Sequence, residues 1–180
     1  MKIYKDFVEH IDAIDNGVSV ILPKFTISTH LNKRVQKLNP AWNEEITQKE
    51  EMDAFIRAMK LTTNEFVETV IYTIKSWLPA RVLVQKAFDN RYSVSESGEI
   101  IQIDSSCPWE EHLHDIESRE NIFIKNVIYY NKNNWRVKCV PITLGSKKYR
   151  RGFPKELLGL KDEKLCKKSG IDDLVFIHAT

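Results

Sequence analysis

The sequence contains no long apolar run. Nowhere in its 180 residues do uninterrupted apolar positions approach the roughly 18–20 that a membrane-spanning helix needs. The beginning, Met1-Lys-Ile-Tyr-Lys-Asp-Phe, carries early charges and has no apolar core of signal-peptide length. These absences predict an intracellular protein without a membrane partner. The sequence does not distinguish cytoplasm, nucleus and mitochondrion.

Cysteine is scarce as well. The three cysteines, Cys107, Cys139 and Cys166, are an odd number at wide and irregular spacing. A disulfide framework or a zinc ribbon needs paired cysteines at characteristic intervals. The sequence therefore predicts reduced thiols.

An excess of one charge is absent overall but present locally. The chain has 27 Lys and Arg against 25 Asp and Glu, a net charge of +2. Residues 132–168 hold 12 basic and 3 acidic side chains, so this segment carries +9 and the remainder −7. Such segregation favours a polyanionic partner, although a solvated lysine-rich face would give the same count.

The first half has a helical pattern. Apolar residues recur at steps of three and four over residues 3–15 and 52–74, and a short helix is expected at 29–38. Pro79 should kink or break the long helix, which then resumes over 80–88.

The second half predicts strands and short helices. Two hairpins are expected, with strands at 91–95 and 99–103 and at 122–130 and 135–142. Short helices at 107–117 and 162–168 and a final strand at 174–178 complete the pattern. The expected fold class is α+β, with a helical first half followed by a mixed or antiparallel sheet built from hairpins with short helices.

Several strings along the chain carry a family resemblance. They are residues 12–17 (DAIDNG), 34–43 (RVQKLNPAWN), 76–81 (SWLPAR), 107–113 (CPWEEHL), and 150–165 with 169–171 and 175–179. In order and spacing they resemble the melanocyte-proliferating-gene family, which is read as metal-dependent 3′–5′ RNA exonucleases related to the DHH phosphoesterases. The resemblance covers nearly the whole chain.

The same comparison shows departures from the family. The chain has no Asp-His-His triplet, and Leu157-Leu158 stands where the family usually has Trp-Arg. It resembles the second half of such an enzyme, and a fragment, a split gene product and a reduced form all remain open. The resemblance implies the end of a DHH-type catalytic domain at 1–45, a helical linker region at 46–90 and an α+β substrate-binding domain at 91–180.

Two aspartates are candidate metal ligands. Carboxylate oxygens suit Mn²⁺ or Mg²⁺, and the resemblance places Asp12 at a metal motif, with Asp15 as the second choice. Without the resemblance, both would be capping groups at a helix end. One aspartate cannot hold a two-metal site, so Asp12 would be an orphaned ligand in this chain alone. No catalytic side chain is assigned.

Basic residues in the matching strings are candidate nucleic-acid ligands. Arg34 and Arg81 offer planar forks for phosphate, and Trp42 or Trp77 nearby would stack on a base. In the other interpretation, the tryptophans are core anchors and the arginines cap or pair at the surface. In the carboxy-terminal region, the resemblance implies phosphate contacts for Arg150, Arg151 and Lys155, and for His178 near the reaction centre.

The resemblance therefore implies the carboxy-terminal portion of a metal-dependent 3′–5′ exonuclease that acts on single-stranded RNA or DNA. Its Mn²⁺ or Mg²⁺ ions would activate water and stabilise both oxygens of the displacement. Two alternatives remain. One is a non-catalytic nucleic-acid-binding module. The other is a half-enzyme completed by a separate amino-terminal DHH half, whose sign would be an exposed apolar face on the first helix and on residues 25–31.

Overall fold

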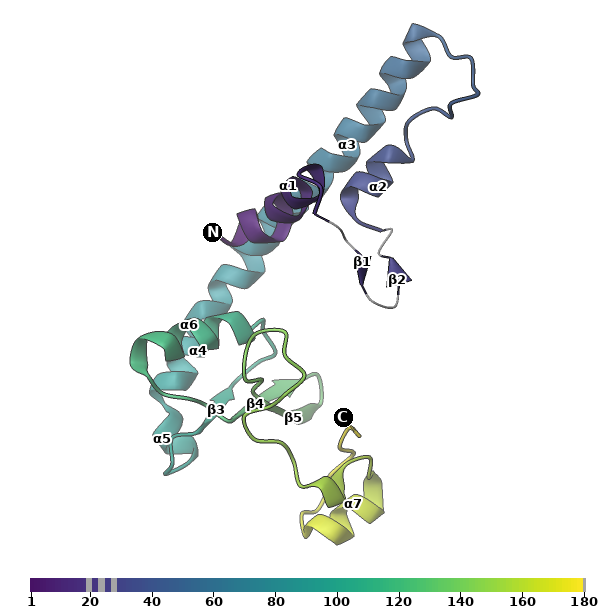
Figure 1. Cartoon of the computed structure of the whole chain (residues 1–180). Helices are drawn as coiled ribbons and strands as arrows, with labels where there is room; N and C mark the ends of the chain where they lie inside the picture. The colour runs from purple at the N-terminus through teal and green to yellow at the C-terminus, as the bar shows by residue number, and fades with distance from the viewer. Residues whose placement is uncertain (19–20, 23–24, 27–28, 180) are drawn as a thin grey trace. The chain divides into compact units, whose positions relative to one another are not determined.

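The computed structural model describes residues 1–18, 21–22, 25–26 and 29–179, and its fold class is α+β, as predicted (Figure 1). The chain divides into two compact units, Met1–Pro79 and Ala80–Thr180, which we call the first and second units. The three-part division by function that the resemblance implies stays a prediction.

The first unit is built along one long helix. Its elements are η1 (Tyr4–Val8), α1 (Glu9–Asp15), β1 (Ile21–Leu22), β2 (Phe25–Thr26), α2 (Leu31–Gln36), α3 (Gln48–Tyr72) and η2 (Thr73–Trp77). A capping box starts α3, because the Thr47 side chain accepts from the backbone of Glu50 while the Glu50 carboxylate accepts from the backbone of Thr47. The helices predicted in this half are confirmed.

The first unit has little core of its own. η1 and α2 contact α3, and Phe7 meets Phe66 edge to face with ring centroids 5.3 Å apart. Among its described residues, the buried apolar side chains are Leu31 and Ala54.

Of the kink or break expected at Pro79, the break is wrong. Helical residues follow one another without interruption from α3 through η2 into α4 (Leu78–Asp89). A π turn, in which the Leu78 N–H bonds the Thr73 carbonyl five residues back, lies immediately before the proline. Pro79 has no N–H to donate to the preceding turn. A π turn shifts the hydrogen bonding by one residue and so accommodates the missing donor, and the helix continues.

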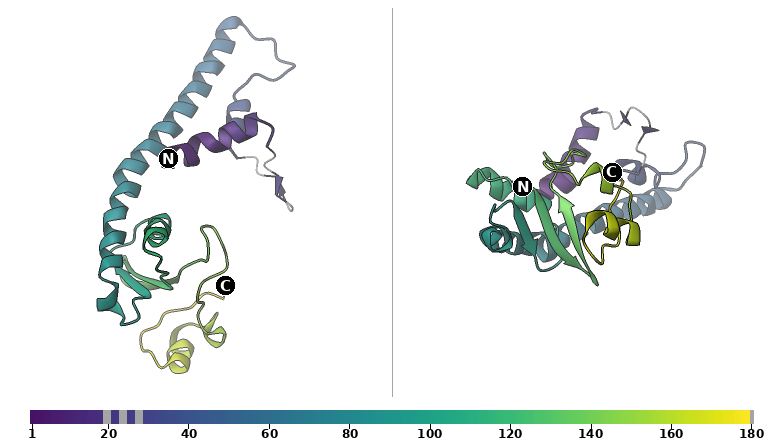
Figure 2. Two further views of the ribbon diagram at one scale, coloured as in Figure 1. Left: turned by 60° about the vertical axis from the view of Figure 1, so that its left-hand side comes forward. Right: turned by 90° about the horizontal axis from the view of Figure 1, so that it is seen from below.

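The second unit holds the hydrophobic core. Its further elements are α5 (Arg91–Val94), β3 (Ile100–Ile103), α6 (Glu110–Glu120), β4 (Asn126–Asn131), β5 (Asn134–Cys139), η3 (Lys155–Leu157) and α7 (Asp162–Ser169). The sheet has the order β3-β4-β5, with β3 parallel to β4 and β5 antiparallel to it (Figure 2). Side chains of α4 and α6 cover one face, where Val84, Leu113 and Ile116 pack with Ile101 and Val127.

Two strand predictions are wrong. Residues 91–94 form α5 instead of a hairpin strand, because Arg91 donates to the Phe88 carbonyl at 2.9 Å and stacks on the rings of Phe88 and Tyr92. β3 pairs with β4 across the α6 crossover. The last segment makes only one bridge, from Phe176 to Lys161, since its backbone bonds go to the short stretch 159–162. The hairpin of β4 and β5 is confirmed.

Gly98 offers a test of this local structure. It has a φ of +63°, and an added Cβ would lie 2.6 Å from the Tyr92 ring. Gly145 has a φ of +74° but open space around it. We expect Gly145→Ala to cost about 1–2 kcal/mol for the left-handed backbone alone. Gly98→Ala should lower the free energy of unfolding further in urea denaturation, and equal losses would contradict the close approach of Tyr92.

Among the described residues, no helix is long and apolar enough to cross a membrane.

Candidate functional site

The sheet of the second unit has one open face. Directly paired residues share a face, so Tyr130 with Trp135 and Ile128 with Val137 lie opposite the side that packs on the helices. Tyr130 and Trp135 are 40% and 56% exposed, and their rings meet edge to face at 5.3 Å. The hairpin therefore presents an exposed aromatic pair, which we call the aromatic platform.

Basic side chains flank the aromatic platform in sequence. Lys132 lies in the turn with a φ of +57°, and Arg136 and Lys138 alternate with Trp135 along β5. All three are exposed. Within 132–168, the ion pairs among described residues are those of Lys138 with Glu110, at 3.9 Å, and of Arg150 with Glu117. Most of the local +9 charge thus faces solvent without an acidic partner in the described part of the chain.

Arg150 is engaged inside the second unit. Its Nη1 donates to Glu117 Oε1 at 2.6 Å and to the Ile124 carbonyl at 2.8 Å, and its Nη2 donates to Glu117 Oε2 at 2.8 Å. Glu117 is 2% exposed, and its Oε1 also accepts the Ile124 N–H at 2.6 Å. A phosphate at Arg150 would have to compete with this bidentate pair.

His114 adjoins the same ion pair. Its Nδ1 lies 3.4 Å from Arg150 Nη2. Burial and the neighbouring guanidinium lower the pKa of His114 below its ordinary value of 6.5, against opposing effects of Glu117 and Glu110. Because Arg150 can only donate, a neutral His114 would accept through Nδ1 and carry its proton on Nε2.

The other predicted ligands of the carboxy-terminal region are exposed. Arg151 precedes η3 and Lys155 is its first residue, and both face solvent. His178 is exposed and meets Phe176 edge to face at 4.7 Å. Their predicted contacts with phosphate stay predictions.

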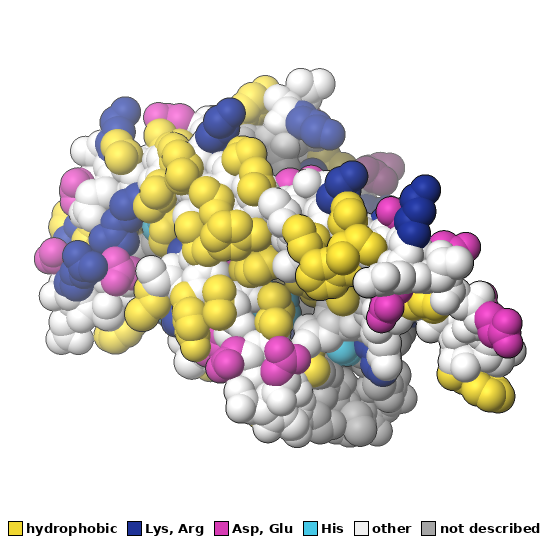
Figure 3. Space-filling view, turned by 90° about the horizontal axis from the view of Figure 1, so that it is seen from above, with side chains coloured by type: hydrophobic (Ala, Val, Ile, Leu, Met, Phe, Trp, Pro, Cys, Tyr) yellow, Lys and Arg dark blue, Asp and Glu magenta, His cyan; other side chains and the backbone are white. Residues whose placement is uncertain are grey.

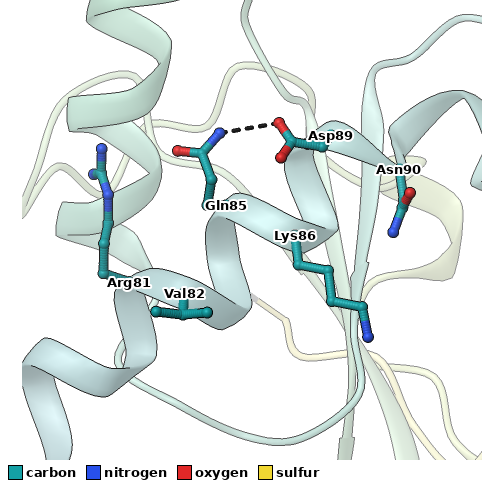
Figure 4. Close-up of a pocket in the computed structure, with 6 residues that line it drawn as sticks. All are labelled: Arg81, Val82, Gln85, Lys86, Asp89 and Asn90. Carbon is teal, nitrogen blue, oxygen red and sulfur yellow. Dashed lines mark hydrogen bonds between the residues drawn. The ribbon is translucent and has the colours of Figure 1, made fainter.

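Arg81 lies on α4 beside a shallow hollow of about 490 Å³. Figure 4 shows the hollow, where Gln85 donates to Asp89 at 3.0 Å. The Arg81 Nη1 donates to the His112 carbonyl at 3.0 Å and pairs with Asp115 at 2.7 Å. Arg81 therefore ties α4 to α6, and its role towards nucleic acid stays a prediction.

Arg34 has a comparable partner in the first unit. It pairs with Glu65 of α3, and its Nε is buried without a partner among the described residues. A shallow hollow of about 470 Å³ adjoins the pair, lined also by Asp6, Glu68 and Tyr72. Since Glu65 already occupies the guanidinium, the predicted phosphate contact of Arg34 also stays a prediction.

The tryptophans near these arginines behave differently from core anchors. Trp42 is 96% exposed, so the expectation that it anchors a core is wrong. Trp77 is half-buried, with the Lys2 ammonium 5.4 Å from its ring centroid.

The predicted metal ligands do not converge. Asp12 and Asp15 are exposed at the end of α1. Asp12 Oδ1 accepts from the Asn16 amide at 3.2 Å, and Asp15 Oδ1 accepts from the Asn32 amide at 2.9 Å. Among the described residues, no group of three or more His, Cys, Asp or Glu could hold a metal ion. These residues alone do not fit a two-metal centre.

Comparison with known proteins identifies the family. A profile named MYG1_exonuc, described as Uncharacterised protein family (UPF0160), matches residues 1–180. This chain belongs to the MYG1 exonuclease family. It is 41% identical over 186 residues to the MYG1 exonuclease of Rattus norvegicus, covering 99% of this chain and 48% of that protein. The resemblance to the melanocyte-proliferating-gene family is thereby confirmed.

Two further relatives show the same proportion. The human MYG1 exonuclease is 40% identical over 186 residues, covering 99% of this chain and 49% of the relative. The MYG1 protein of Dictyostelium discoideum is 38% identical over 189 residues, covering 99% and 56%. The chain thus spans about half the length of these MYG1 proteins, their carboxy-terminal portion. No solved structure matches it.

Two features escaped the sequence reasoning. The aromatic platform was missed, although Tyr130 and Trp135 flank the predicted turn symmetrically and Trp135 lies in the basic segment. The pair of Glu117 and Arg150 was missed because 33 residues separate its members. The available signal was the position of Glu117, four residues after buried Leu113 on the same side of α6.

Proposed function

We propose that this chain supplies the substrate-binding portion of a metal-dependent 3′–5′ exonuclease that acts on single-stranded RNA or DNA. Membership of the MYG1 exonuclease family supports the enzyme class. The observation that carries the substrate class is the aromatic platform, whose Trp135 lies within the segment of net charge +9.

Single-stranded nucleic acid suits this surface for two reasons. An exposed aromatic ring can stack on any base, because every base has a π face. Exposed lysines and arginines neutralise the backbone phosphates and release condensed counterions. Lys132 lies in the turn that joins the two strands, so a base on the aromatic platform and a phosphate at Lys132 would meet at the same hairpin. Arg136 and Lys138 lie on the opposite face of β5, because side chains alternate along a strand.

The metal site of the proposed enzyme would need residues from the portion of the relatives that this chain does not span. Asp12 remains a candidate contributor to it, with Asp15 as the second choice.

A second candidate is a nucleic-acid-binding module without catalysis. It is favoured by the positions of Asp12 and Asp15, whose carboxylates accept amide hydrogen bonds from two different asparagines.

The first test measures binding of the whole chain to end-labelled single-stranded RNA at several salt concentrations. We expect the logarithm of the affinity to fall linearly with the logarithm of salt, by about 0.7 for each phosphate neutralised. Lys147→Glu with Lys148→Glu should weaken binding, whereas Lys49→Glu with Lys60→Glu changes the same charge in the first unit and should matter less. Equal weakening, or binding that ignores salt, would contradict the proposed surface.

A second arm separates the two candidates. The RNA is incubated with Mn²⁺, with EDTA and Asp12→Asn as controls, in the presence and absence of the amino-terminal portion of a MYG1 relative. Shortening from the 3′ end only after this addition would support the exonuclease. Binding without shortening in either case would favour the module. Shortening by the chain alone would show a metal site within it.

A further inference from the structure

Helix α3 carries an exposed apolar stripe along its length. The side chains are each between 37% and 59% exposed: Met52, Phe55, Ile56, Met59, Phe66, Val67 and Ile71 in α3, and Ile74 in the η2 turn that continues it. Most are separated by three, four or seven residues, so they share one broad side of the helix. Figure 3 shows hydrophobic side chains gathered at the surface on one face of the molecule. We call the eight residues the α3 stripe.

Except at Phe66, which meets Phe7 edge to face, the α3 stripe differs from the side of the helix that the first unit already covers. That covered side contains buried Ala54 and the Glu65 carboxylate that meets Arg34 of α2. A third side is polar and includes Arg57, which is exposed and has no stripe residue three or four positions away. The stripe lies on the remaining side. Its apolar side chains are exposed where a stable surface helix normally has polar residues.

The exposed apolar surface is out of proportion to the core of the first unit. Only Leu31 and Ala54 are buried apolar residues among its described positions, whereas the core cluster belongs to the second unit. Trp42, 96% exposed, and Ile46, 39% exposed, add apolar surface just before α3 begins. Contiguous apolar surface of this extent marks an interaction site, and a tryptophan is a favoured anchor of such sites.

We propose that the α3 stripe is the docking surface for the amino-terminal portion of the MYG1 protein. The match covers 99% of this chain but only 48% of the rat and 49% of the human MYG1 exonuclease. About half of each relative therefore lies outside the matched region, and this unmatched half is long enough to form a domain. The proposal holds whether that portion belongs to the same polypeptide or to a separate one.

A globular partner fits the width of the α3 stripe better than a second copy of the helix does. A coiled-coil seam uses two apolar positions in seven. The stripe is wider, because Ile56 lies beside Phe55 and Val67 beside Phe66. A broad stripe of this kind is the pattern of a helix that faces a domain core.

The α3 stripe is not the apolar face that the half-enzyme alternative predicts, which would lie on the first helix and on residues 25–31. On the first helix, Tyr4 and Val8 are exposed, whereas Ile3, Phe7, Ile11 and Ile14 are half-buried. Leu31 is buried. The rest of the expected apolar face at 25–31 includes residues 27 and 28, which lie outside the described residues.

The test measures binding between the whole chain and the purified part of the rat MYG1 exonuclease that the match leaves out, by titration calorimetry. We expect a one-to-one complex in which Met59→Asp or Val67→Asp weakens affinity about 30-fold or more, as for a hot-spot residue. Arg57→Gln lowers the charge by the same one unit on the polar side of α3 and should bind like the unchanged chain. Hydrogen exchange should show new protection of α3 in the complex.

Three outcomes would overturn the proposal. If the two polypeptides do not bind, the amino-terminal portion is not the partner that covers the α3 stripe. A loss of affinity with Arg57→Gln as large as that with Met59→Asp would show that the α3 stripe is not the binding surface, provided that circular dichroism shows equal helicity. A dimer of the chain in light scattering that Met59→Asp converts to monomer would assign the stripe to a second copy. None of these readouts depends on nucleic acid, so they are independent of the proposed function.

Discussion

Glu117→Ala is expected to lower the free energy of unfolding of the second unit by about 3–5 kcal/mol, because it leaves the buried Arg150 guanidinium without its partner. Glu117 is 2% exposed and Arg150 12% exposed at the side chain. The change also removes the acceptor of the Ile124 N–H. Such a loss is a large part of the roughly 5–15 kcal/mol that stabilises an ordinary domain. Urea denaturation followed by the fluorescence of Trp109 and Trp135 would measure it.

A matched control lies on the same helix. Glu120 is an exposed residue near the end of α6, and Glu120→Ala should change stability by no more than about 0.5 kcal/mol. Replacing both members, as in Glu117→Leu with Arg150→Met, should recover much of the loss because no buried charge is left unpaired. A small effect of Glu117→Ala, close to that of Glu120→Ala, would show that the pair is not held in a buried environment.

Trp135→Ala should weaken binding of single-stranded RNA about 5- to 150-fold, which corresponds to the roughly 1–3 kcal/mol that a base-stacking aromatic contributes. Trp135 is 56% exposed and makes its ring contact with Tyr130, so its removal leaves the core of the second unit intact. Trp135→Phe keeps a stacking ring and should retain most of the affinity. Fluorescence anisotropy with a labelled oligonucleotide would give the dissociation constants.

Trp42→Ala is the matched control for this prediction. Trp42 is another exposed tryptophan, but it lies in the first unit, outside the basic segment. Its removal should leave RNA affinity nearly unchanged. If Trp42→Ala weakened binding as much as Trp135→Ala, the RNA contact would be assigned to the segment 34–43 and not to the aromatic platform.

Helix pattern and hairpin chemistry were readable from the sequence for local reasons. The apolar spacing of residues 52–74 and the turn residues Asn131–Asn134 act over a few neighbouring positions, and both elements formed as predicted. The error at residues 91–95 arose because five residues are too few for the alternation of polar and apolar side chains to separate a strand from a helical turn. Arg91 decided between them through its contacts with Phe88 and Tyr92.

The candidate site was only partly readable. The charge of 132–168 and the family membership followed from residue order. The engagement of Arg34, Arg81 and Arg150 did not, because each pairs with an acidic residue more than 30 positions away. A sequence shows which side chains can bind phosphate, whereas folding decides which of them a carboxylate already occupies.

The sequence by itself determined the family, the α+β class and the segregation of charge, since these depend on composition, periodicity and the order of motifs. Only the tertiary structure decided that β3 runs parallel to β4, that the sheet keeps an open aromatic face, and that α3 exposes an apolar stripe. The physical reason is that burial and pairing are properties of contacts between distant segments. The sequence alone does not distinguish an apolar residue that is buried in a core from one that is exposed for a partner.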